Sequence, residues 1–175
     1  MKSVLAISGS LRAASLNSAL LRAAAQLAPP EMNIVIYTGL GDLPLFNPDI
    51  EASDPAPVAD LRRRIVDADA LIVAGPEYAH GITGVLKNAL DWMVGNESFV
   101  DKPVALFNAS PLSEHATPAL REVVKTMSAR VVDAASVTVA VRGYHRTTAG
   151  ILADMTIAAA LREALRTLHR YLNVG

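Results

Sequence analysis

The chain has 175 residues, of which 51% are hydrophobic and 19% are charged, and this composition excludes an intrinsically disordered protein. The 16 Lys and Arg residues nearly balance the 17 Asp and Glu residues, so the net charge of −1 offers no basic excess for nucleic acid or an anionic membrane. The absence of cysteine excludes disulfides, thiolate metal ligands and cysteine catalysis. No apolar run approaches the roughly 20 residues of a membrane span, and the first one is too short for a signal peptide. We therefore expect a cytoplasmic protein with a single domain over residues 1–175.

Strand-like and helical patterns alternate along the chain. Five apolar runs predict β-strands at residues 4–7, 34–37, 70–74, 104–107 and 136–141. Each run is apolar on successive residues, which is typical of strands covered on both faces. Helical periodicity follows them at residues 16–27, 60–66, 85–93, 117–127 and 161–172. This alternation predicts an α/β protein with a five-stranded parallel sheet in the order 2-1-3-4-5 and helices on both faces.

Two details of the connections can also be predicted. Thr117 is expected to cap its helix, with Pro118 at the first helical position. Residues 39–57 hold four prolines and no periodic pattern, and we expect an irregular surface loop there.

The turn after the first strand, at residues 8–17, is rich in hydroxyl groups and opens into a helix. The N–H groups and the dipole of a helix N-terminus favour negative charge. Ser10, Ser15 and Asn17 supply hydrogen-bond donors, and Arg12 adds a charge-assisted partner, so we predict a phosphate site. The alternative is an ordinary helix cap with a solvated Arg12. The turn lacks the glycine patterns of dinucleotide and NTPase loops, which argues against NAD(P) or ATP as the tightly held ligand there.

Two further loops follow the third and fourth strands, at residues 75–84 and 108–113. In the first of them Pro76 fixes φ, and Gly81 lets the main chain approach a ligand closely. The alternative is a plain strand-to-helix turn in which Tyr78 only packs. Because the carboxyl ends of parallel strands meet at one edge of the sheet, all three loops are expected to contact one planar ligand with a phosphate at one end.

The histidines do not indicate a metal site in the sequence. His80, His115, His145 and His169 lack pairwise ligand spacing, and no carboxylate cluster completes a triad with them. We expect His80 and His145 to line the crevice and His169 to lie on a helix surface. A hydrolase is disfavoured because Ser10 lacks the Gly-x-Ser-x-Gly elbow.

Two motifs resemble the NADPH-dependent FMN reductase family, a flavodoxin-like group. Residues 9–17 match Gly-Ser-Leu-Arg-x-x-Ser-x-Asn in full. Residues 76–78 match Pro-Glu-Tyr, and residues 84–92 match Gly-x-Leu-Lys-Asn-Ala-Ile-Asp-Trp with leucine in place of isoleucine. The resemblance implies a flavodoxin-like three-layer sandwich and FMN as cofactor, with NADPH or NADH as co-substrate. Hydride would pass through the bound FMN to quinone, flavin, azo or metal-oxyanion acceptors.

The resemblance also implies a small-molecule electron acceptor and a homodimer or homotetramer, whereas the balanced charge predicts no nucleic-acid partner and no membrane. Two other readings stay open. One is a flavin-binding electron carrier without its own NAD(P)H activity, and the other is a flavin-less regulatory or scaffold domain.

The family places the FMN phosphate on the first turn and the isoalloxazine edge against the loop at residues 76–78, mostly through backbone amides. No catalytic side chain is expected, because the flavin carries the chemistry. Ala79 and Thr83 stand where the family commonly has asparagine and proline, and both changes are expected to alter the rim over the flavin. The third loop lacks the family's usual glycine pair. The predicted cofactor-binding residues are Ser10, Arg12, Ser15, Leu16, Asn17, Pro76, Glu77, Tyr78, Ala79, His80, Gly81, Ser110 and Pro111.

Overall fold

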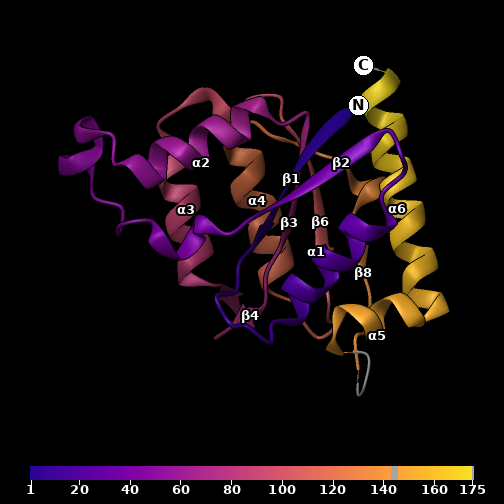
Figure 1. Ribbon diagram of the computed structural model, residues 1–175. Coiled ribbons are helices and arrows are strands. Elements are labelled where there is room, and N and C mark those ends of the chain that lie inside the picture. Colours follow the sequence, from indigo (N-terminus) through magenta and orange to yellow (C-terminus); the bar gives the residue numbers. More distant parts are fainter. Residues whose placement is uncertain (143–145, 175) are drawn as a thin grey trace.

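A computed structural model describes residues 1–142 and 146–174 and shows a parallel sheet between two layers of helices (Figure 1). The long strands are β1 (Lys2–Ser8), β2 (Met32–Tyr37), β3 (Ala70–Ala74) and β6 (Pro103–Asn108). The sheet runs in the order β2-β1-β3-β6-β7, and all its pairings are parallel. The predicted flavodoxin-like order is therefore confirmed.

The last edge of the sheet differs from the prediction of one strand at residues 136–141. Two short strands, β7 (Arg130–Val131) and β8 (Val137–Thr138), both pair with β6, which makes the sheet six-stranded. Between them the backbone N–H of Leu106 donates to the Ser136 hydroxyl at 3.0 Å. A side chain thus takes the place of a backbone acceptor in the ladder, and the edge is broken there.

Alternate residues of each central strand face opposite helical layers. Val4 and Ala6 belong to a core beneath one layer, whereas Leu5 and Ile7 belong to the core beneath the other. The first layer holds α1 (Leu16–Leu27), α5 (Thr148–Ala153) and α6 (Met155–Val174). The second layer holds α2 (Ala56–Asp67), α3 (Gly84–Val94) and α4 (Ala116–Thr126). Because both faces are covered, the strand residues are apolar in succession.

Three connections differ from the expected ones. Helix α4 begins at Ala116 and has His115 in the cap position, so the prediction of a Thr117 cap is wrong. Helix α5 was not predicted, and the stretch from residue 39 holds the short helices η1 (Gly39–Asp42) and η2 (Pro48–Ser53) before α2 begins. The remaining short elements are η3 (Glu97–Phe99), η4 (Asp133–Ala135), β4 (Glu77–Tyr78) and β5 (Gly81–Ile82).

The proline-rich loop is fastened to α3 by polar contacts. The indole Nε1 of Trp92 and the Nδ2 of Asn88 both donate to the carbonyl of Pro44, at 2.8 and 2.9 Å. Phe46 meets the Trp92 ring edge-on, with 5.1 Å between the ring centroids. Trp92 is only 2% exposed and is a packing residue. Within the part of the chain that the structure describes, no helix has both the length and the apolar character needed to cross a membrane.

Leu161→Ala should lower the free energy of unfolding by about 2–5 kcal/mol, because Leu161 is 0% exposed on the inner face of α6. Met155→Ala in the same helix is the control and should change it by less than about 0.5 kcal/mol, because Met155 is 86% exposed. Urea unfolding followed by the fluorescence of the single tryptophan measures both. Equal losses in the two variants would contradict the inward orientation of Leu161.

Candidate functional site

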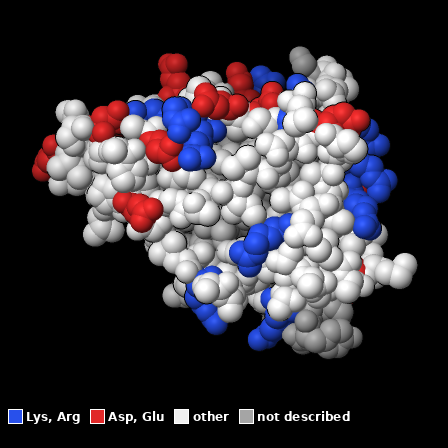
Figure 2. All heavy atoms as spheres, viewed as in Figure 1, with Lys and Arg blue, Asp and Glu red and all other residues white. Residues whose placement is uncertain are grey.

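A pocket of about 390 Å³ lies where the loops after β1, β3 and β6 meet. All of the predicted cofactor-binding residues line it except Gly81 and Pro111. This edge of the molecule is the lower one in Figure 1, and Figure 2 shows basic side chains and no acidic ones along the lower margin of the same face. The surface around the pocket mouth on this face is therefore favourable to an anion.

The turn after β1 provides both the cap and the anion donors that the sequence left as alternatives. The Ser15 hydroxyl caps α1 by accepting from the Ser18 N–H at 3.2 Å. The Ser10 hydroxyl accepts from the Arg12 N–H at 3.4 Å. Arg12 is exposed and lines the pocket, and no carboxylate among the described residues pairs with its guanidinium. Its charge is thus free to meet an anion beside the start of α1, where helix N–H groups lack internal acceptors.

Asn17 has a structural role that the sequence did not indicate. Its side chain is only 5% exposed, and its Oδ1 accepts from the Ala109 N–H at 3.2 Å. Ala109 follows β6, so this hydrogen bond fastens the first loop to the third. Asn17 therefore fixes the shape of the pocket in addition to lining it.

Gly9 and Thr83 hold the first loop against the start of α3. A Cβ atom at Gly9 would lie 3.0 Å from Cδ2 of Leu86, so only glycine fits there without movement. The Thr83 hydroxyl donates to the Gly9 carbonyl at 2.6 Å and accepts from the Leu86 N–H at 3.4 Å. Thr83 is 4% exposed and does not line the pocket, so the expectation that it alters the rim is wrong. It is the N-cap of α3.

The second loop is a tight hairpin formed by β4 and β5. Its two turn residues, Ala79 and His80, have φ values of 49° and 59°. Two successive residues with positive φ are typical of a type I′ turn, which favours asparagine and glycine. For other residues this conformation costs about 1–2 kcal/mol each. The chain thus accepts backbone strain at the place where the hairpin borders the pocket.

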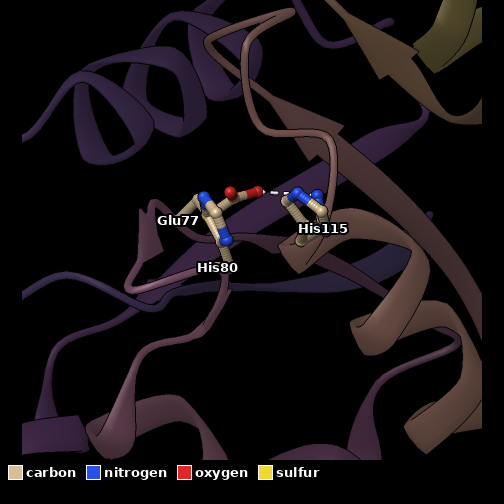
Figure 3. A group of neighbouring side chains, drawn as sticks. All are labelled: Glu77, His80 and His115. Atoms are coloured by element: carbon tan, nitrogen blue, oxygen red, sulfur yellow. Dashed lines mark hydrogen bonds between the residues drawn. The ribbon is translucent and has the colours of Figure 1, made fainter.

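The carboxylate of Glu77 joins the second loop to the third. Its Oε2 accepts from the N–H groups of His115 and Ala116 at 2.7 and 2.9 Å, which are the first donors of α4. Figure 3 shows the hydrogen bond to His115. These N–H groups, that of Ala116 foremost, lower the pKa of Glu77 below its ordinary value. A distant carboxylate therefore caps α4, which explains why Thr117 does not.

Two histidines stand beside this carboxylate. The rings of His80 and His115 are stacked, with centroids 4.3 Å apart and planes inclined by 26°. His80 lines the pocket as expected, whereas His145 lies outside the described residues. His169 lies on α6, where its ring is 3.2 Å from Nδ2 of Asn173.

The predicted list of cofactor-binding residues left out several residues of the pocket wall, although all of them lie in the loops at residues 8–17 and 108–113 that were expected to contact the ligand. The buried Ser113 hydroxyl has no hydrogen-bond partner among the described residues and is a donor for a bound ligand. The missed residues are Ala14, Asn108, Ala109, Leu112 and Ser113.

The donor set of the pocket fits FMN. The hydroxyls of Ser10 and Ser15, the Arg12 guanidinium and the N-terminus of α1 suit a phosphate dianion. The cavity volume is in the range of about 300–1,000 Å³ that is usual for cofactor sites. The exposed Leu112 and Tyr78 add apolar surface for a planar ring.

Glu77→Gln tests the contribution of the charged cap, because glutamine keeps an acceptor oxygen but removes the charge. The pKa of Glu77 is lowered in the folded chain, so its ionised form stabilises the fold above the ordinary pKa of 4.5 and loses this effect as the pH falls through the lowered pKa. The wild-type chain should thus melt higher at about pH 7 and lose that advantage toward about pH 3. Thermal melts across this range measure the difference, with the exposed Glu122→Gln in the same helix as control. A difference independent of pH would contradict the assignment.

Residues 2–145 match the family described as NADPH-dependent FMN reductase. A curated relative, the NAD(P)H-dependent FMN reductase PA1204 of Pseudomonas aeruginosa, is 46% identical over 110 residues, which cover 61% of this chain and 59% of that protein. The 2-hydroxy-1,4-benzoquinone reductase of a Burkholderia species is 38% identical over 105 residues, covering 58% of this chain and 57% of that protein. The chain thus spans less than two thirds of the length of these relatives.

Solved structures extend the likeness over nearly the whole chain. The flavoenzyme NAD(P)H:(acceptor) oxidoreductase FerB of Paracoccus denitrificans is 25% identical, with a TM-score of 0.79 over 97% of this chain and 98% of that one. An azoreductase of Bacillus anthracis shares the fold at 19% identity, with a TM-score of 0.62 over 97% of this chain and 100% of that one. The family match covers most of this chain, and the motifs and the fold agree with it. The chain therefore belongs to the NADPH-dependent FMN reductase family.

Proposed function

We propose that this chain is a single-domain NAD(P)H oxidoreductase that binds FMN and passes hydride to small-molecule acceptors, with quinones as the first candidates. The observation that carries the proposal is the pocket itself, in which an anion-binding turn after β1 lies opposite a strained hairpin after β3. The family uses FMN and NAD(P)H. Quinone acceptors are supported by relatives named quinone reductases, among them that of Escherichia coli K12, which is 32% identical over 61% of this chain. Free flavin, azo compounds and metal oxyanions are further candidates.

The chain's own residues bind and orient the cofactor. Ser10, Ser15 and Arg12 would hold the phosphate at the start of α1, and the main chain of residues 77–80, which lines the pocket, would lie beside the ring. FMN, when bound, supplies the hydride chemistry, so the protein needs no nucleophile or general base of its own. The rim residues Tyr78 and Leu112 are 53% and 79% exposed, and they leave room beside the ring for a nicotinamide or an acceptor.

A homodimer or homotetramer is part of this proposal and rests on the family resemblance, whereas the proposed cytoplasmic location rests on the sequence composition. Large apolar side chains remain exposed on the single chain, for example Leu45 at 83% and Val94 at 62%. A subunit interface would cover side chains of this kind.

Arg12→Ala should weaken FMN binding, because it removes a charge-assisted hydrogen bond worth about 1.5–3 kcal/mol, equivalent to roughly a 10- to 150-fold rise in Kd. Arg12→Lys keeps the charge and should give a smaller loss. Fluorescence titration of the flavin-free protein measures both. Arg166→Ala is the matched control, since Arg166 is an exposed arginine on α6 away from the pocket wall. An unchanged Kd in Arg12→Ala would place the phosphate elsewhere.

Anaerobic mixing of the FMN-loaded protein with NADPH or NADH should bleach the visible flavin absorbance without any partner protein. Subsequent addition of a benzoquinone should restore it, because electrons leave through the same open rim. Stopped-flow absorbance measures both steps. Bound FMN that neither nucleotide reduces would identify an electron carrier instead, and a chain that binds no FMN would support the flavin-less alternative.

A further inference from the structure

Three potential metal ligands meet at the rim of the flavin pocket. One ligand atom from each of Glu77, His80 and His115 can be chosen so that all three lie within 4.8 Å of one another (Figure 3). Glu77 is the first residue of β4, His80 is in the turn between β4 and β5, and His115 directly precedes α4. Glu77 and His115 are 38 positions apart, so local sequence spacing did not reveal the group.

The ligand set is suited to a divalent transition metal. Two imidazole nitrogens and one carboxylate oxygen bind Zn²⁺, Co²⁺, Ni²⁺ or Fe²⁺ and leave coordination positions open. Ligand atoms at about 2.1 Å from a tetrahedral ion lie about 3.4 Å apart. The spacings in the group must therefore close by at most about 1.4 Å. Both histidines are exposed, so rotation of their side chains can supply this movement.

The carboxylate is already oriented for this role. Its Oε2 is held by the N–H groups of His115 and Ala116, which leaves Oε1 for a cation. Such outer contacts fix the direction of a ligand before the metal arrives. Among the described residues, no lysine or arginine forms an ion pair with Glu77 that would compete with a metal ion.

The two imidazoles lie close together although one of them belongs to a residue with an unusual backbone conformation. His80 has a φ of 59°, a left-handed conformation that is uncommon for residues other than glycine. Its ring nonetheless stacks on that of His115 at 4.3 Å. Both rings are exposed, so burial in a hydrophobic core does not explain their pairing.

We propose that Glu77, His80 and His115 bind one divalent transition-metal ion at the rim of the pocket. The ion ties the β4–β5 hairpin to the N-terminus of α4, and its open positions accept water or an oxygen ligand. The alternative is a stacked histidine pair that only closes the hairpin onto α4. The proposal does not depend on flavin chemistry, because the three ligands come from the chain alone.

Zn²⁺ titration calorimetry on the tag-free protein, with and without FMN, tests the site, and Co²⁺ provides a visible absorption spectrum that reports imidazole ligands. One ion per chain is expected. His115→Ala and His80→Asn should each weaken binding at least ten-fold and remove the Co²⁺ spectrum. Asparagine tolerates positive φ, so His80→Asn keeps the turn. His169→Ala removes a histidine outside the group and should bind as the wild-type chain does.

Three outcomes would overturn the proposal. They are equal Zn²⁺ binding in all variants, no binding in the wild-type chain, and loss of binding only in His169→Ala. Circular dichroism checks the folding of each variant. Glu77→Gln provides a third test, because it keeps an acceptor for α4 while weakening a metal site at least ten-fold. Since the metal alone is the probe and FMN-free protein is included, a failure here leaves the FMN titration and the NADPH reduction unaffected.

Discussion

The capping of α4 by Glu77 is the interaction on which the shape of the site depends. Parallel strands bring the three loops to one edge of the sheet, but they do not fix the loops to one another. The Glu77 carboxylate ties the second loop to the third through two backbone N–H groups, and Asn17 ties the first loop to the third through Ala109. Thr83 completes the connection by joining α3 to Gly9. Hydrogen bonds between the loops therefore fix the shape of the pocket, while the groups that could donate to a ligand remain available.

Backbone strain in the pocket wall lies at the hairpin turn. The hairpin turn places Ala79 and His80 at positive φ, and the exposed Tyr78 and Leu112 border the opening. The turn proposed to hold the phosphate, in contrast, leads into α1 with a regular cap at Ser15. A capped turn for an anionic tail and exposed side chains at the opening are compatible with the proposed exchange of two substrates at one cofactor. The pairing of His80 with His115 lies on the side of this hairpin.

Much of this could be read from the sequence because the signals were local. The uninterrupted apolar runs predicted the buried parallel strands, and the two motifs located the turn after β1 and the hairpin after β3. The errors came from contacts between distant segments. Thr117 has the residue type of a cap, yet Glu77 takes that role from 40 positions earlier in the chain. Thr83 was expected at the rim and instead lies buried, because its hydroxyl bonds the Gly9 carbonyl.

The sequence by itself determined the fold class, the position of the site at the carboxyl ends of the strands and the residues suited to a phosphate, since periodicity and residue type within short windows decide these features. Only the tertiary structure decided which loops are fastened together, that a broken edge replaces the fifth strand, and that Glu77, His80 and His115 meet. The physical reason is that these features depend on hydrogen bonds and ring contacts between segments tens of residues apart. Neither hydrophobic patterning nor local spacing encodes such contacts.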